Sequence, residues 1–110
     1  MSKDTLGDFE LLVLLACVRL GDERAYAVSI VDEIQARTGR ETHRAAVYVT
    51  LQRLEKKGLV STALGPPADE RGGKPRRHVR VESAGTEAVR SSRQAFQRMW
   101  AGLGPQLEDR

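Results

Sequence analysis

The sequence has a single cysteine, few aromatic residues and no long apolar run, and these shortages exclude several classes of protein. Cys17 cannot form an internal disulfide or a cysteine-rich metal site; we expect a small buried side chain there, with redox sensing as the alternative. The longest apolar run covers only residues 11–18, far short of the roughly 18 residues that a membrane span needs. Residues 1–10 are unlike a secretion signal, so we expect a cytoplasmic protein with no membrane partner.

Sequence signatures of catalysis and of cofactor binding are also missing. His43 and His78 have no neighbouring cysteine and no carboxylate at the spacing of metal ligands. No nucleophile elbow occurs, and Gly72-Gly73-Lys74 lacks the upstream glycine and the serine or threonine of a phosphate-binding loop. We therefore expect that the chain is not an enzyme and holds no cofactor or metal.

The charge and length of the chain indicate one small globular domain with a basic segment. It has 110 residues, of which 30% are charged and 40% hydrophobic, a composition typical of folded domains. The net charge of +3 is only mild evidence for an anionic partner. Residues 71–80, however, contain cations and no acid, and such a local block attracts phosphate. These cations are Arg71, Lys74, Arg76, Arg77 and Arg80.

Hydrophobic periodicity predicts four helices and two strands. The first helix is expected to begin at Asp8, as its N-cap, and to run to about Leu20, with Gly21 as the stop. It is apolar on nearly every side, and a helix of that kind is buried on more than one face. A second subunit would help to cover it. The second helix is expected to begin near Tyr26 and to end at Gly39.

A third helix is expected from the N-cap Thr42 to Gly58. Val47, Leu51 and Leu54 recur at steps of four and three, so they mark the side that faces the core. The opposite side carries small or polar residues, which suits a helix that enters the major groove of DNA, about 12 Å wide. The residues of this outer side are Ala45, Val49, Gln52 and Lys56, flanked by Arg44, Tyr48 and Arg53.

Two alternating segments, residues 59–64 and 78–81, predict a pair of strands. Glycine and proline between them indicate a loop over residues 65–75, so the pair forms a long basic hairpin, or wing. A last helix is expected from about residue 83 to Leu103, ended by Gly104-Pro105. Its apolar stripe needs a partner helix and consists of Ala88, Val89, Ala95, Phe96, Met99, Trp100 and Leu103.

The predicted fold is therefore mainly α with a small two-stranded β hairpin. Residues 1–82 are expected to form a winged helix-turn-helix DNA-binding domain. Residues 83–110 are expected to form a C-terminal dimerisation helix and a short tail. One helix with a cationic outer face followed by a basic hairpin makes double-stranded DNA the first partner to consider.

Four segments of the chain resemble the PadR family of bacterial transcriptional regulators in order and spacing. They are LGDFELLVL (6–14), AYAV (25–28), AVYVTLQRLEKKGLV (46–60) and GGKPRR (72–77), and the resemblance covers about residues 6–85. Three positions depart from the family pattern. Ala27 replaces the usual glycine after tyrosine, and His78-Val79 replaces the aromatic residues of the wing. VESAG (81–85) replaces the usual Leu-Thr before glycine, so Glu82 or Ser83 must cap the last helix.

The resemblance implies a homodimer, held by the last helix together with the first, that binds operator DNA and usually represses. The expected DNA-binding residues are His43, Arg44, Ala45, Tyr48, Val49, Gln52, Arg53, Lys56, Lys74, Arg76 and Arg77. The expected dimer interface consists of Leu11, Leu14, Leu15, Val89, Phe96, Met99, Trp100 and Leu103.

Several of these residues allow a second interpretation. Tyr48 either hydrogen-bonds a phosphate or lies partly buried in the core. His43 and Arg44 either approach DNA or are solvated surface residues. Gln52 has the groups to bond an adenine edge. The wing arginines either contact phosphate or the minor groove or form an ordinary solvated charge run. Trp100 either packs in the dimer interface or binds a small aromatic or apolar effector.

The sequence thus predicts a dimeric transcriptional regulator, by resemblance a repressor, that binds a palindromic operator. Contact is expected through a recognition helix over about residues 43–57 and a basic wing over about residues 65–78. The alternative function is a winged-helix module that binds a protein through the same face and has no specific affinity for DNA.

Overall fold

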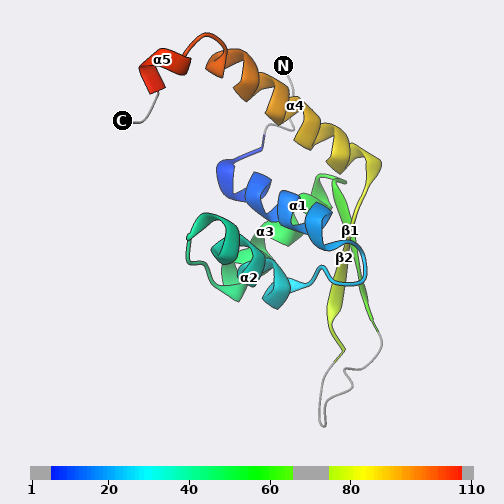
Figure 1. The fold of residues 1–110 in the computed structure, drawn as a ribbon. Helices are drawn as coiled ribbons and strands as arrows, with labels where there is room; N and C mark the ends of the chain where they lie inside the picture. The colour runs from blue at the N-terminus through cyan, green and yellow to red at the C-terminus, as the bar shows by residue number, and fades with distance from the viewer. Residues whose placement is uncertain (1–5, 66–74, 108–110) are drawn as a thin grey trace.

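The protein is mainly helical and has one two-stranded hairpin (Figure 1). The computed structural model describes residues 6–65 and 75–107. Its elements in chain order are α1 (Asp8–Leu20), α2 (Ala27–Thr38), α3 (Arg44–Lys56), β1 (Val60–Leu64), β2 (Arg77–Val81), α4 (Ser83–Trp100) and α5 (Gly104–Leu107). The predicted fold class is confirmed. None of the helices in these ranges has the length and hydropathy of a membrane span.

The core lies between α1, α2, α3 and the hairpin. Val47, Leu51 and Leu54 of α3 are 0%, 7% and 0% exposed, which confirms the core side predicted for this helix. Because an α-helix has 3.6 residues per turn, steps of four and three keep all three side chains on one side. Full burial of one such side chain stabilises the folded state by roughly 1.5–3 kcal/mol.

Helix α1 turns only part of its apolar surface toward this core. Val13, Leu14, Ala16 and Cys17 are buried, whereas Leu15 and Val18 are exposed. Leu14 is 0% exposed inside its own chain, and a side chain without exposed surface cannot contact a second copy. This corrects the expectation that Leu14 belongs to a dimer interface.

In two helices the N-cap lies one residue away from the residue predicted for that position. Gly7, not Asp8, is the N-cap of α1, and the Glu10 carboxylate accepts a hydrogen bond from the Gly7 N–H at 3.0 Å. The acid three residues into the helix therefore provides the capping interaction. At α3 the N-cap is His43 instead of Thr42, and the His43 carbonyl accepts from the Val47 N–H at 3.2 Å.

Helix α4 begins as expected and ends earlier than expected. Glu82 is its N-cap, one of the two residues proposed for that position. The helix stops at Trp100, not Leu103, because Gly102 adopts the left-handed conformation with φ of 82°. Gly104-Pro105 then opens the short helix α5 instead of ending α4, since proline is tolerated in the first turn of a helix.

Strands β1 and β2 are antiparallel, with Val60 opposite Val81 and Leu64 opposite Arg77. The ladder continues one step further, where the Gly65 N–H donates to the Arg76 carbonyl at 2.7 Å. Expectation and structure agree on the hairpin, although β2 begins at Arg77, one residue earlier than expected. The predicted loop over residues 65–75 lies mostly outside the described residues.

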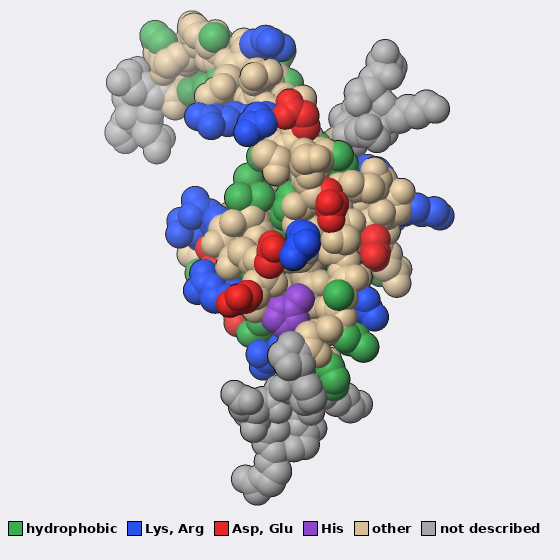
Figure 2. All heavy atoms as spheres, turned by 90° about the vertical axis from the view of Figure 1, so that its right-hand side faces the viewer, with side chains coloured by type: hydrophobic (Ala, Val, Ile, Leu, Met, Phe, Trp, Pro, Cys, Tyr) green, Lys and Arg blue, Asp and Glu red, His purple; other side chains and the backbone are tan. Residues whose placement is uncertain are grey.

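Helix α4 is attached to the rest of the molecule by its first turns. The Glu82 N–H donates to the Leu59 carbonyl at 3.0 Å, and a side chain at buried Gly85 would collide with the same carbonyl. From there the helix leads away from the three-helix core, and its far end stands clear of the body (Figures 1 and 2). Met99 and Trp100 at that end are 76% and 62% exposed.

Candidate nucleic-acid interface

The outer side of α3 forms one continuous exposed surface. All eight residues expected there are solvent-exposed in the structure: His43, Arg44, Ala45, Tyr48, Val49, Gln52, Arg53 and Lys56. Tyr48 and Val49 are about half exposed, so the alternative that Tyr48 lies in the core does not agree with its position. The side chains on this surface are small, polar or cationic apart from Tyr48 and Val49, so the helix stays slim enough for a major groove.

Among the cations on α3 and at its C-cap, only Lys57 is paired with a carboxylate of the described residues. Lys57 lies on the inner side, where its ammonium is 3.1 Å from the Glu10 carboxylate of α1. Arg44, Arg53 and Lys56 make no salt bridge with any carboxylate in the described part of the chain. Their charges are therefore available to phosphate, which is the contact that dominates affinity for DNA.

The returning arm of the wing starts with two exposed arginines, each of which donates a hydrogen bond to a neutral hydroxyl group. Arg76 Nη1 donates to the Tyr26 hydroxyl, and Arg77 Nη1 donates to the Thr62 hydroxyl, each at 3.1 Å. Thr62 in turn contacts the Glu55 carboxylate at 3.3 Å, so Arg77 lies close to the end of α3. The structure thus links Arg77 to the end of α3 and Arg76 to the start of α2. Lys74, the third wing cation expected to bind DNA, lies outside the described residues.

One further arginine of the hairpin, Arg80, has an acidic partner. Arg80 of β2 pairs with Asp22 at 3.1 Å, and the His78 ring is 3.2 Å from the Asp22 carbonyl. The face of the molecule shown in Figure 2 accordingly carries basic and acidic side chains beside one another. Arg76 differs from Arg80 because no carboxylate of the described residues lies within salt-bridge distance of it.

Sequence reasoning missed the two hydroxyl residues that hold the wing arginines. The sequence identifies Tyr26 only as the start of the second helix, and it includes Thr62 only within the strand predicted over residues 59–64. Tyr26 and Arg76 are 50 positions apart, so local periodicity contains no signal for their contact. Only the proximity of the α2 start to the wing, which is a property of the folded chain, reveals it.

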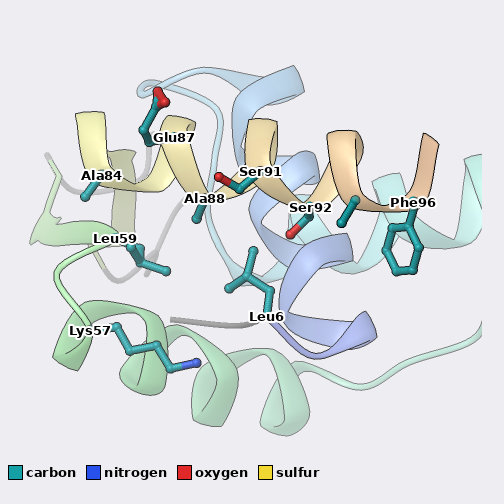
Figure 3. A pocket seen from close by; sticks show the side chains of 10 residues that line it. Leu6, Lys57, Leu59, Ala84, Glu87, Ala88, Ser91, Ser92 and Phe96 are labelled. Carbon is teal, nitrogen blue, oxygen red and sulfur yellow. The ribbon is translucent and has the colours of Figure 1, made fainter. Parts of the chain in front are cut away.

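Two grooves lie beside α4. One has a volume of about 680 Å³ and separates α4 from the end of α3, with Leu6 and Leu59 pointing into it (Figure 3). The other, of about 360 Å³, lies between α1 and α4 and is lined mainly by apolar side chains. Residues expected in a dimer interface surround this second groove: Leu11, Leu15, Val89, Phe96 and Trp100. Met99 and Leu103 lie exposed further along the chain.

The chain matches the model of the transcriptional regulator PadR-like family over residues 14–91. It belongs to this family. The protein is therefore a DNA-binding transcriptional regulator and not an enzyme. A comparison with curated proteins found no match.

Several solved structures have a similar fold. A PadR family regulator from Eggerthella lenta is 28% identical with a TM-score of 0.65, over 90% of this chain and 83% of that one. A PadR family regulator from Clostridium difficile is 16% identical with a TM-score of 0.69, over 92% of this chain and 99% of that one. BpsR of Bordetella bronchiseptica, whose DNA binding is regulated by 6-hydroxynicotinic acid, is 22% identical with a TM-score of 0.63. The match covers 96% of this chain and 74% of that one.

Proposed function

We propose that this PadR-like protein is a homodimeric repressor that binds a palindromic operator with α3 in the major groove and the wing against the flanking backbone. The observation that carries the proposal is the set of exposed cations without acidic partners on α3, together with Arg76 at the base of the wing. Repression follows if the bound protein covers the site that RNA polymerase needs. We place this function in the cytoplasm, where a regulator meets the bacterial chromosome.

Individual contacts follow from the position of each residue on α3. His43 and Arg44 lie at the start of the helix, where residues of a recognition helix approach bases and where the N–H groups favour phosphate. Gln52 presents the donor and acceptor pair that fits an adenine edge. Ala45 and Val49 are proposed to pack on thymine methyl groups, and the Tyr48 hydroxyl is proposed to bond a phosphate oxygen. Arg53, Lys56, Arg77 and Lys74 are proposed to contact the backbone.

Dimerisation is supported by the apolar surface that α1 and α4 leave uncovered. Residues 1–82 act as the DNA-binding part in this proposal and residues 83–110 as the dimerisation part. The groove between α1 and α4 and the exposed side chains of Phe96, Met99, Trp100 and Leu103 form an apolar area at one end of the molecule. Apolar surface gathered in this way marks an interaction site, and a second copy covers it in a two-fold dimer.

Trp100 is also proposed as part of an effector site. It lines the groove of about 360 Å³ together with Phe96, and the few polar groups there are contributed by Arg93 and Gln97. A flat aromatic ligand fits such a lining, and regulation of BpsR by 6-hydroxynicotinic acid supplies a precedent in a protein of similar fold. Loss of the response to ligand in Trp100→Ala is the expected result, measured at a protein concentration high enough to keep the variant dimeric and bound to the operator; an unaltered response would end the proposal.

The test of the main proposal is selection of binding sites from a random duplex library, followed by titration of the selected site at several salt concentrations. We expect a palindrome with half-site centres about one helical turn apart and a Kd of roughly 10⁻⁸ to 10⁻¹¹ M. Gln52→Ala should relax the preference at one base pair, worth about 1–3 kcal/mol, and Lys56→Ala should reduce the salt slope by about 0.9.

Gln35→Ala is the matched control, because Gln35 is an exposed glutamine of α2 outside the proposed DNA surface. It should leave both affinity and preference unchanged. Weak binding without sequence preference would instead favour the second candidate, a winged helix that docks on an acidic protein surface.

A further inference from the structure

The guanidinium of Arg76 is held by a single aromatic side chain. Its central carbon lies 4.4 Å from the centre of the Tyr26 ring, and its Nη1 donates to the Tyr26 hydroxyl at 3.1 Å. The first contact is a cation–π interaction and the second is a hydrogen bond. Together they restrict both the position and the orientation of the guanidinium plane, although the side chain itself is exposed.

The backbone of Arg76 is fixed as well. Its carbonyl accepts from the Gly65 N–H at 2.7 Å, the last described pair of the hairpin ladder. A Cβ atom at Gly65 would lie 2.7 Å from a ring carbon of His78, so a larger residue there would have to displace that ring. Arg76 is thus anchored at its main chain by the opposite arm of the hairpin and at its side chain by Tyr26.

Tyr26 is itself held in place by its neighbours. The preceding residue, Ala25, accepts a hydrogen bond from the Val79 N–H at 2.9 Å, which ties this part of the chain to β2. The Tyr26 and His78 rings are 5.6 Å apart at a tilt of 52°. On the other side, the Tyr26 N–H donates to Ser29 Oγ at 3.1 Å at the start of α2. The ring therefore has a fixed place between α2 and the base of the wing.

The chemistry of Tyr26 determines which further contacts the Arg76 guanidinium can make. The Tyr26 ring and hydroxyl are neutral, so they orient the guanidinium without cancelling its charge, unlike Asp22 at Arg80. A guanidinium has five N–H donors, and the bond to Tyr26 uses one of them. The others remain for a phosphate, which accepts two parallel hydrogen bonds from arginine. Ordering the side chain before DNA arrives also reduces the loss of conformational entropy on binding.

We propose that Tyr26 is a positioning residue for DNA binding, which holds Arg76 of the wing ready for a backbone phosphate while leaving its positive charge free. Tyr26 acts through Arg76 and makes no base contact. The proposal rests on the proposed function, since it requires that the wing meets DNA.

A double-mutant cycle on the full chain tests this, with affinity and salt slope measured for the selected operator. Tyr26→Leu should weaken binding about two- to fivefold, the range of an exposed cation–π contact, and Tyr26→Phe should retain part of the affinity because the ring remains. Arg76→Ala should lower the salt slope by about 0.9. In the Arg76→Ala background, Tyr26→Leu should change affinity by less than the measurement error, because the residue it acts through is absent.

Arg37→Ala serves as the matched arginine control, because Arg37 pairs with Glu33 on α2 away from the wing. An equal loss from Tyr26→Leu in both backgrounds would overturn the proposal, because Tyr26 would then act on the whole fold or on DNA directly. No loss in either background would overturn it too. If the wild-type chain shows no specific binding, the proposed function fails instead, and the two failures are distinguishable.

The free protein offers a readout that does not depend on DNA. Protons of the Arg76 side chain should show ring-current shifts in the NMR spectrum that persist in Tyr26→Phe and vanish in Tyr26→Leu. Absence of these shifts in the wild-type chain would overturn the positioning role, whatever the DNA experiments give.

Discussion

The thiol of Cys17 shows how burial changes the chemistry of one side chain. Cys17 is 2% exposed in the core next to Leu14 and Val13 of the same helix. Burial raises the pKa of the thiol to about 12 from its ordinary value of 9.0, because the thiolate would lose its hydration. At neutral pH the group is therefore a protonated, unreactive part of the core, which disfavours the alternative of a redox sensor.

We expect alkylation of Cys17 by iodoacetamide to be limited by unfolding. Since the thiol is neutral and inaccessible in the folded state, its labelling rate in buffer should be lower than in urea by at least a hundredfold, within the range of typical unfolding equilibria. The chain has no other cysteine, so the unfolded sample is its own reference. Folding stability should also fall as pH rises from 9.0 toward 12, where only the unfolded thiol ionises readily. Equal rates in buffer and urea would contradict this.

At the scale of elements, one ion pair joins α1 to α3. Lys57 Nζ contacts both carboxylate oxygens of Glu10 at 3.1 Å, and both side chains are partly buried. Burial alone raises the pKa of the Glu10 carboxyl, but the Gly7 N–H and the Lys57 ammonium outweigh this effect and hold the pKa below 4.5. The pair fixes the inner end of α3 and thereby the direction of its outer surface.

Glu10→Gln should lower the free energy of unfolding by about 1 kcal/mol at pH 7, because it leaves the Lys57 charge without a partner. The native pKa is depressed, so the stabilisation is present above the unfolded value near 4.5 and is lost as pH falls through the folded value. Urea unfolding should therefore show the difference of about 1 kcal/mol between wild type and variant at pH 7 and a smaller difference at pH 3.

Glu87→Gln provides the control for this experiment, since the Glu87–Arg90 pair is about two-thirds exposed on both sides. It should change stability little at either pH, as surface pairs generally do. An equal loss of stability in both variants would mean that the Glu10–Lys57 pair contributes no more to folding than a surface pair.

The sequence predicted those features that depend on local periodicity. Val47, Leu51 and Leu54 indicated the core side of α3, because a helix with one buried side has apolar residues at steps of three and four in its sequence. The cap at Gly7 was missed because it depends on Glu10 reaching back, and the end of α4 was missed because glycine at 102 stops it before Gly104-Pro105.

Features that depend on the packing of distant segments could not be predicted in this way. A helix that is apolar on nearly every side does not reveal which side faces its own core, so Leu14 was assigned to the wrong surface. The contact between Tyr26 and Arg76 joins segments 50 residues apart. Neither residue type nor spacing indicates such a contact before the chain is folded.

At the scale of the whole molecule, the shape is elongated. The principal dimensions are 54 × 36 × 20 Å, and the radius of gyration of 15.8 Å exceeds the roughly 13 Å of a compact chain of about 100 residues. The far end of α4 contributes to this extension because it leads away from the three-helix body (Figure 1). Its exposed side chains gain little by contact with their own chain, and the proposed dimer would bury them.

We expect the wild-type chain to sediment as a dimer at micromolar concentration. Trp100→Ser and Met99→Ser should each raise the dissociation constant by at least tenfold, since burial of one such side chain contributes about 1.5–3 kcal/mol. Val28→Ser is the matched control, because Val28 is an exposed apolar residue of α2 remote from this surface. Sedimentation equilibrium measures all four proteins. A monomeric wild type would contradict the dimer and the role proposed for α1 and α4.

Because Gly85 is pressed against Leu59, the start of α4 has a fixed direction, and unbroken helix follows as far as Trp100. Each residue of an α-helix adds about 1.5 Å of length and about 100° of rotation. One residue inserted in this stretch would therefore swing the apolar end a quarter-turn or more around the axis, with no change in the atoms that meet DNA. In the proposed dimer, the distance and angle between two recognition helices, and with them the spacing of half-sites in the operator, are set by how many residues α4 contains.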